Sequence, residues 1–164
     1  MKAHWDIETL WSYYMRKVII ALILGLIAVP AEANEIECLA KNIYYEARDQ
    51  SLTGMYAVAG VTLNRVKDRR WPNDICAVVK QRSIVQNQWI CQFSWFCDGK
   101  SDRPKDLYNW NVCYTIAYVA IKDNALGFIP SNTYWYHNNE VKPYWASAYH
   151  RTAIIGDHTF YSDR

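Results

Sequence analysis

The feature that most constrains this chain is an uncharged apolar run near its start. Residues 18–29 read VIIALILGLIAV, and Arg16 and Lys17 stand directly before them. A membrane-spanning helix needs about 20 apolar residues, so the run is short for a span. Ala31 and Ala33 follow in the small-x-small pattern that signal peptidases cut. We therefore expect a secretory signal, with the folded part after it.

Cleavage after Ala33 would separate residues 1–33, an N-terminal extension plus the signal, from a domain over 34–164. Met15 is an alternative start for such a signal. The alternative to cleavage is an uncleaved anchor, which would be the chain's only contact with a membrane. Either hypothesis places the domain outside the cytoplasm, in the periplasm or the extracellular cell wall.

Composition narrows the class of the domain. The chain is 51% apolar and 21% charged, which excludes a disordered chain. The net charge of +2 gives no basic field for nucleic acid, so we expect no nucleic-acid partner. Five cysteines in a short chain favour an oxidising compartment. With no linker or repeat visible, we expect a single domain that acts as a monomer.

Hydrophobic periodicity predicts an α+β fold that is mainly helical, with a small late sheet. Apolar residues at helical spacing predict four helices, over about 35–48, 52–67, 74–80 and 105–125. Aromatic and β-branched residues predict short strands, over 133–137, 152–155 and 158–162. The segment 81–104 has no predicted element, and a loop of that length is usually functional or tied by a disulfide.

Two of these helices carry predicted buried faces. In the helix over 52–67, which Ser51 or Thr53 can cap, the face comprises Met55, Val58, Ala59, Thr62 and Val66. In the helix over 105–125 it comprises Leu107, Trp110, Tyr114, Ala117, Tyr118 and Ile121, and Gly127 suits the stop.

One carboxylate has the profile of a catalytic acid. Glu46 ends the first predicted helix, beside Leu39 and Ile43 at the edge of the apolar stripe. Partial burial disfavours its charged form, and so does the negative end of the helix dipole. Both effects raise its pKa, as a general acid at neutral pH requires. The structural alternative is a boundary glutamate paired with a cation such as Arg48.

Two aromatic-rich segments suit the binding of sugar rings, whose faces stack while their hydroxyls need fixed polar partners. The first is 91–99, which lies between two cysteines. The second is 134–138, which we predict to be a strand. Its alternation places Tyr134, Tyr136 and Asn138 on one face and Trp135 and His137 on the other. The alternative is that these aromatics fill a core.

These segments resemble the SleB/CwlJ-type cell wall hydrolases, the family of the spore-cortex-lytic enzymes. Residues 40–48 read AKNIYYEAR, where the family has a pattern like A-x-x-I-Y-x-E-A-R-G-E. Segments 92–99, 136–145 and 155–161 are similar to further family motifs in the same order. The cysteines and the signal resemble those of proteobacterial and phage relatives.

The resemblance implies a lysozyme-like or lytic-transglycosylase-like fold that cleaves peptidoglycan glycan strands, with its catalytic glutamate at Glu46. We expect no cofactor and no metal. The chain departs from the family at Asp49-Gln50-Ser51, where a glycine usually follows E-A-R. A family threonine falls on Thr133 or on Tyr134, depending on a one-residue shift, so its role stays open.

A single glutamate suffices for a lytic transglycosylase acting on the bond between N-acetylmuramic acid and N-acetylglucosamine. Hydrolysis would require a second carboxylate, for which Asp98 and Asp49 are the candidates. The side chains expected to hold or stack on the sugars are Gln92, Ser94, Trp95, Tyr136, His137, Asn138 and Trp145.

The cysteines leave their pairing open. Cys38, Cys76, Cys91 and Cys97 allow two disulfides in three pairings. We take Cys91–Cys97 with Cys38–Cys76 as a working hypothesis. Cys113 is then the free thiol, on a predicted helix and away from its main apolar stripe.

Other functions remain as alternatives. A zinc amidase would cut the peptide from the muramyl lactate, and His137, His150 and His158 could serve it, although no familiar ligand spacing is present. A cysteine peptidase would need an activated Cys–His pair. A non-catalytic peptidoglycan-binding module would bind without cutting. The sequence does not separate cell-wall remodelling from phage-type host lysis.

Overall fold

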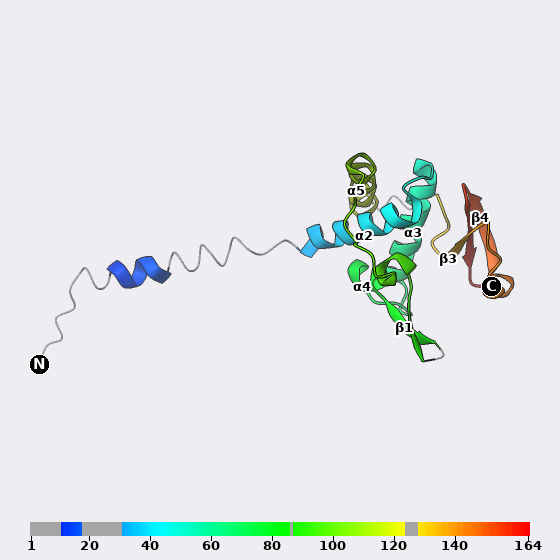
Figure 1. Ribbon diagram of the computed structural model, residues 1–164, viewed down its shortest axis with the longest axis horizontal. Helices are drawn as coiled ribbons and strands as arrows, with labels where there is room; N and C mark the ends of the chain where they lie inside the picture. Colours follow the sequence, from blue (N-terminus) through cyan, green and yellow to red (C-terminus); the bar gives the residue numbers. More distant parts are fainter. Residues whose placement is uncertain (1–10, 18–30, 86, 124–127) are drawn as a thin grey trace, which may run out of the picture. The chain divides into compact units, whose positions relative to one another are not determined.

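The computed structural model describes residues 11–17, 31–85, 87–123 and 128–164 (Figure 1). The predicted signal run at 18–29 therefore lies outside the described residues. The chain divides into two units, over 1–31 and 32–164. In the first unit a short helix covers residues 11–17. No helix in the described part of the chain combines the length and the apolar character that crossing a membrane requires.

Four α-helices are described in the second unit. They are α2 (Ala31–Ala47), α3 (Leu52–Lys67), α4 (Ile75–Val79) and α5 (Leu107–Lys122). The start of α2 precedes the predicted one, so the predicted cleavage site lies in its first turn. Side chains cap the other three, because Ser51, Asp74 and Asp106 each accept a hydrogen bond from a backbone N–H three residues later.

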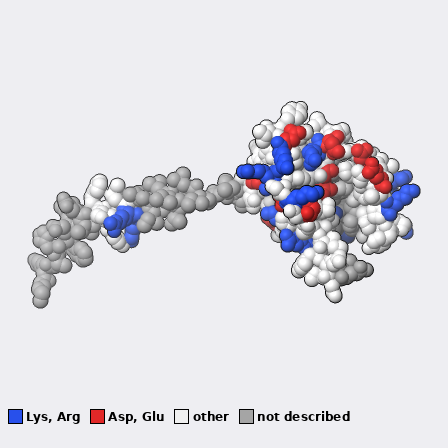
Figure 2. All heavy atoms as spheres, viewed as in Figure 1, with Lys and Arg blue, Asp and Glu red and all other residues white. Residues whose placement is uncertain are grey.

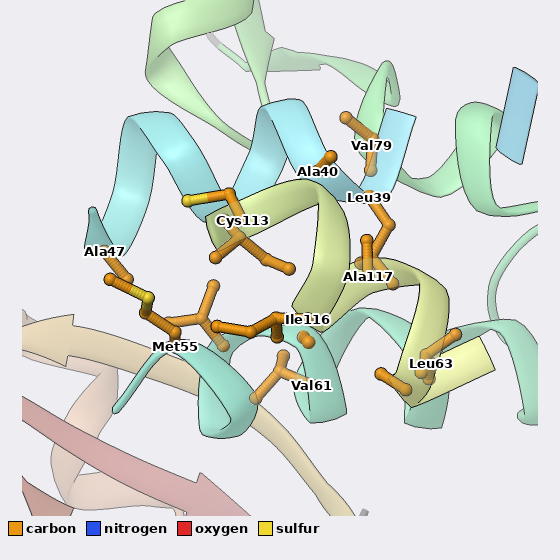
Figure 3. Close-up of a cluster of buried hydrophobic side chains, with 14 of the residues drawn as sticks. Leu39, Ala40, Ala47, Met55, Val61, Leu63, Val79, Cys113, Ile116 and Ala117 are labelled. Carbon is orange, nitrogen blue, oxygen red and sulfur yellow. The ribbon is translucent and has the colours of Figure 1, made fainter. Parts of the chain in front are cut away.

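α3 is the central helix of this unit and is buried on all sides. The sequence predicted one buried face, but residues 54–65 are nearly all buried. Gly54, Ala57, Ala59 and Gly60 carry small or no side chains, which lets neighbouring elements approach closely. In Figure 3 the side chains Val61 and Ile116 meet between α3 and α5.

The buried face of α5 differs from the predicted one. The structure buries Cys113, Ile116, Ala117 and Ala120, whereas Leu107 is 71% exposed. Tyr114 and Tyr118, which the predicted stripe placed inside, are also exposed. The reason is packing distance, because small side chains let α5 lie close against α3 while the bulky tyrosines stay outside. Gly127, the predicted stop, lies outside the described residues.

The segment predicted as a long loop contains regular structure. A hairpin of β1 (Arg82–Val85) and β2 (Gln88–Cys91) is followed by a 3-10 helix, η1 (Ser94–Cys97). Asn87, in the turn, has a φ of 63°, the left-handed conformation that asparagine tolerates. Both strands are mostly exposed, so their sequence lacks the alternation that reveals a half-buried strand.

Two disulfides fasten the helical part. Cys38–Cys76 joins α2 to α4, and Cys91–Cys97 joins β2 to the end of η1. These are the two bonds of the working hypothesis. Cys113 is free and buried. Burial also raises the pKa of its thiol to about 11, so it is inert at neutral pH.

The late sheet has three antiparallel strands, and α3 packs against β3. Along the sheet the order is β3 (Thr133–Asn138), β5 (His158–Ser162) and β4 (His150–Ile155). A second 3-10 helix, η2 (Tyr144–Ala148), connects β3 to β4. Figure 1 shows this sheet beside α3. Phe160 of β5 is fully buried and ties the sheet to the core.

A bulge near the start of β3 sets the directions of its side chains. The register with β5 shifts between Thr133 and Trp135. Tyr134 and Trp135 therefore do not alternate as predicted, and both rings contact Trp71, at 5.1 and 5.9 Å between centroids. Beyond the bulge the alternation resumes.

Candidate active site

Glu46 lies where the end of α2 meets the sheet. It follows the fully buried Ile43 by one turn and is itself half-buried. The hydroxyl of Tyr136, on β3, donates a hydrogen bond to Glu46 Oε2 at 3.0 Å. This contact joins segments 90 residues apart and fixes the direction of the carboxyl group.

The pKa of Glu46 is raised above the usual glutamate range. Burial is the main cause, while the Tyr136 hydrogen bond and the nearby Arg65 charge oppose it. The sequence predicted this direction and named burial as a cause. Burial and the Glu46 charge raise the pKa of Tyr136 well above its usual value, so its phenol remains a donor.

Arg65, on α3, is a member of the site that the sequence analysis missed. Only 2% of it is exposed, and its Nε donates to the carbonyl of Tyr134 at 2.8 Å. Burial lowers its pKa to about 10, which still leaves it a cation at neutral pH. No described residue accepts a hydrogen bond from its Nη1. The available signal was its position, three residues after Thr62 on the predicted buried face.

Trp95, predicted as a stacking platform for sugar, is largely buried, and that predicted role stays a prediction. It is 8% exposed, because η1 turns its ring into the core. Its indole N–H donates to Asn42 Oδ1 at 3.2 Å. One ring face stacks on Tyr45, at 4.8 Å between centroids and an interplanar angle of 19°. Trp95 therefore supports Tyr45, the half-buried neighbour of Glu46.

Gln92 and Ser94 lie on the same segment as Trp95. Both are exposed, and they alternate with the buried Phe93 and Trp95. The hydrogen bonds among described residues connect neither side chain to Glu46. Their predicted role in holding sugar stays a prediction.

His137 and Trp145 lie in an aromatic cluster on the other face of β3, away from Tyr136. The His137 ring bonds to the Tyr161 hydroxyl through Nε2 at 2.9 Å and to the Asn138 carbonyl through Nδ1 at 2.8 Å. Trp145 meets His137 edge-on at 5.7 Å. The alternation of the strand therefore directs His137 to the face of β3 opposite Tyr136 and Glu46, and the predicted role of His137 and Trp145 in binding sugar stays a prediction.

Asn138 ends β3 and is exposed. Its side-chain oxygen accepts a hydrogen bond from the backbone of Glu140 at 2.8 Å. Thr133, one candidate for the family threonine, is fully buried and bonds to Thr152 at 3.2 Å. Tyr134, the other, stacks on Trp71. Neither position is bonded to Glu46 among the described residues, so neither is assigned the role of the family threonine.

The two candidate second carboxylates are engaged elsewhere. Asp98 accepts a hydrogen bond from the backbone N–H of Lys100 at 2.8 Å. Asp49 is exposed and accepts a hydrogen bond from Gln50 at 3.5 Å. The groups that perturb Glu46 are instead a phenol and a guanidinium. In the described ranges no three His, Cys, Asp or Glu side chains are placed to hold a metal ion.

Gln50, which lies where the chain departs from the family pattern after E-A-R, has a structural role. Gln50 Nε2 donates to Asp157 Oδ2 at 2.9 Å, and Gln50 Oε1 accepts from the Asp157 N–H at 3.0 Å. Gly156, with a φ of 56°, approaches Gln50 so closely that a Cβ would collide with the amide oxygen. Gln50 therefore ties the turn between β4 and β5 to the end of α2, beside Glu46.

A cleft of about 470 Å³ lies along the last turn of α2. Tyr44, Tyr45 and Arg48 form one wall, and the segment 98–106 forms the other. The predicted sugar-stacking residue Trp95 also lines this cleft. Glu46 itself is not among the lining residues, although its neighbour Tyr45 is.

Two solved structures from Bacillus species share this fold. The catalytic domain of the Bacillus cereus SleB protein matches with a TM-score of 0.56 and 22% identity, over 79% of this chain and 90% of that chain. The catalytic domain of the germination-specific lytic transglycosylase SleB from Bacillus anthracis matches with the same score and identity, over 79% and 94%. The likeness shows that this chain shares the fold of these two catalytic domains.

The family follows from sequence. The cell wall hydrolase family matches residues 49–161, more than half of the chain, and the chain belongs to this family of peptidoglycan-cleaving enzymes. The matched segment begins just after Glu46, so membership rests on α3 and the elements after it. No curated protein matches the chain in sequence.

Proposed function

We propose that this enzyme cuts the bond between N-acetylmuramic acid and N-acetylglucosamine by lytic transglycosylation, with Glu46 as acid and then base. The observation that carries the proposal is the bond from the neutral Tyr136 hydroxyl to a half-buried carboxyl group of raised pKa. A carboxyl group whose pKa is raised by burial and whose direction is fixed by a hydrogen bond suits general acid catalysis.

In the first step protonated Glu46 gives its proton to the glycosidic oxygen. The bond from that oxygen to C1 of the muramic residue breaks, and positive charge develops at C1. Glu46 becomes a carboxylate as this charge forms. Its negative charge is stabilised by the Tyr136 hydroxyl and by the Arg65 cation, the two groups that lower its pKa.

In the second step the muramyl C6 hydroxyl attacks C1 and Glu46 takes the proton of that hydroxyl. A C1–O6 bond forms, which gives a 1,6-anhydro end and restores the protonated carboxyl. One group thus serves both steps, and no water is consumed. A hydrolytic glycosidase would need a second carboxylate about 5–9.5 Å from the first. The engagement of Asp49 and Asp98 with their own neighbours favours the single-glutamate route.

The site of action proposed for the enzyme is outside the cytoplasm, on peptidoglycan glycan strands. Two disulfides support an oxidising compartment. Exported by its N-terminal signal, the enzyme would serve cell-wall remodelling or host lysis.

Product analysis tests the proposal. The full chain, with disulfides intact, is incubated with purified peptidoglycan, and soluble products are identified by mass spectrometry. We expect muropeptides that are lighter than hydrolysis products by one water and have no reducible end. Reducing muramic ends would instead show hydrolysis, and intact glycan with released stem peptides would show an amidase. Glu46→Gln is the matched control, because it keeps the shape of the side chain and removes the acid.

A further inference from the structure

The cleft along the last turn of α2 is lined by charged side chains that the proposed reaction does not use. It carries four cationic side chains, Arg48, Lys100, Arg103 and Lys105. It also carries three carboxylates, Asp98, Asp102 and Asp106. Figure 2 shows that the viewed face of the second unit likewise intersperses basic and acidic side chains. The cleft therefore presents both signs of charge to one ligand.

The cleft lies on the same turn of α2 as the proposed catalytic group. Tyr45 lines it and directly precedes Glu46 on α2. Consecutive side chains of a helix diverge by about 100°, so the cleft and the Glu46 carboxyl group lie on different sides of α2. A helix is about 10–12 Å across and an extended tetrapeptide spans about 13–14 Å, so a stem peptide on the muramic residue at Glu46 is long enough to reach the cleft.

The far wall is held in place by α2. The Tyr44 hydroxyl accepts hydrogen bonds from the backbone N–H groups of Lys105 at 3.3 Å and Asp106 at 3.1 Å. The Tyr45 hydroxyl donates to the carbonyl of Ser101 at 3.3 Å. The Cys91–Cys97 disulfide secures the chain just before this segment. The cleft is preformed, so a ligand does not have to order it.

Some of the charged side chains that line the cleft are available to bind a ligand. Asp98 pairs with Lys100 at 3.5 Å, and Asp106 caps α5. By contrast, the side chains of Asp102, Arg103 and Lys105 make no hydrogen bond or ion pair with any residue the structure describes. These three groups leave two cations and one anion unpaired in the cleft.

Charge separates the two parts of the substrate. The N-acetylated sugars of peptidoglycan are neutral, because the muramyl lactate is joined to its peptide as an amide. The stem peptide carries carboxylates and, in the diaminopimelate type, also an ammonium group. A neutral sugar ring requires neither cations nor carboxylates, whereas a peptide with both signs of charge matches this wall.

We propose that the cleft binds the stem peptide of the muramic residue at the cleaved bond, and that the enzyme thereby prefers peptide-bearing glycan to denuded glycan. The inference rests on the proposed function, which places the glycan strand at Glu46. Arg103 and Lys105 bind the peptide carboxylates, and Asp102 faces the ammonium group.

A substrate comparison tests the inference. The full chain is assayed on uncrosslinked glycan strands and on the same strands after an amidase has removed their peptides. In the double variant Arg103→Gln/Lys105→Gln, the ratio of kcat/KM on peptide-bearing to peptide-free strands should fall about tenfold, as loss of two exposed ion pairs implies. The matched control, Lys80→Gln/Lys142→Gln, removes the same charge outside the cleft and should keep the wild-type ratio. An unchanged ratio in the first double variant would overturn the inference.

A binding measurement separates this inference from the proposed function. Calorimetry measures the affinity of a free stem tetrapeptide of the diaminopimelate type for the full chain carrying Glu46→Gln. We expect binding that weakens with added salt and with Arg103→Gln/Lys105→Gln. Such binding without any glycan cleavage by the wild type would sink the proposed function and leave the peptide site standing. Glycan cleavage with no peptide binding would do the reverse.

Discussion

The two faces of strand β3 carry adjacent residues with different tasks. Tyr136 points toward the helices and donates a hydrogen bond to Glu46. His137, the next residue, points the other way and bonds to Tyr161. Sequence reasoning gave both the same role in holding sugar. The structure separates them by the alternation of a single residue.

The difference shows that one sequence motif can contain both a residue that contacts the proposed catalytic group and a residue that stabilises the fold. On the inner face, the Tyr136 hydroxyl donates a hydrogen bond to the Glu46 carboxyl group, so a substitution of Tyr136 should alter the proposed acid. On the outer face, His137, Trp145, Tyr149 and Tyr161 pack against one another through ring contacts. Such a cluster stabilises the sheet and holds η2 in place. Neighbours in a sequence motif therefore need not share a site.

The largest effect should come from Glu46 itself. Glu46→Gln removes the exchangeable proton while its amide oxygen can still accept the Tyr136 hydrogen bond. We expect the rate of glycan cleavage to fall by about 10²–10⁴-fold, the usual contribution of a general acid–base group. The rate is measured as release of soluble muropeptides, with circular dichroism as the check on folding. A folded variant that cuts at the wild-type rate would remove Glu46 from the mechanism.

Tyr136→Phe should have the next largest effect. It removes the hydrogen bond that stabilises the Glu46 carboxylate, and a bond to a charged group contributes about 1.5–3 kcal/mol. We expect kcat to fall by about 10–100-fold. Because that bond lowers the pKa of Glu46, its loss should also move the alkaline limb of the pH–rate profile to higher pH. A profile that stays in place would argue against the coupling of the two groups.

His137→Phe sharpens the comparison from the other face. The substitution keeps a ring in the cluster and removes the hydrogen bond to Tyr161. We expect stability to fall by about 1 kcal/mol, seen as a melting temperature lower by a few degrees. Glycan cleavage should stay close to the wild-type rate. A loss of activity as large as that of Tyr136→Phe would return His137 to the active site.

The smallest expected effect is a gain in stability from Glu46→Gln. The folded-state pKa of Glu46 lies above its unfolded value because burial penalises the charge. Below the unfolded pKa both states are protonated and there is no penalty, and above the folded pKa the penalty is complete. The variant should therefore melt a few degrees higher at neutral pH, with the difference vanishing as the pH falls to the ordinary glutamate range. An equal difference at all pH values would contradict this origin.

Local sequence patterns were sufficient to predict several features of the fold and of the candidate site. Helical spacing beside Leu39 and Ile43 located Glu46 and predicted the direction of its pKa. The period of two in β3 correctly separated Tyr136 from His137. The caps at Ser51 and Asp74 set the starts of α3 and α4 close to the predicted positions.

Other features depend on contacts between distant segments, which one sequence does not display. Trp95 is buried because Asn42 and Tyr45 of α2 meet it, and nothing within its own loop indicates this. The buried face of α5 is set by the close approach of α3, which favours Cys113 and Ala117 over the larger tyrosines. Arg65 carried a local signal, a cation on an apolar face, but its hydrogen-bond partner Tyr134 lies on the distant strand β3.

The most direct test of the central claim is the titration of Glu46 itself. The full chain is labelled with ¹³C at the glutamate carboxyl groups, and the Glu46 signal, assigned by its absence in Glu46→Gln, is followed by NMR as the pH changes. We expect a pKa above the usual glutamate range that coincides with the alkaline limb of the pH–rate profile and rises further in Tyr136→Phe. A pKa at or below the usual range, unmoved by Tyr136→Phe, would contradict it.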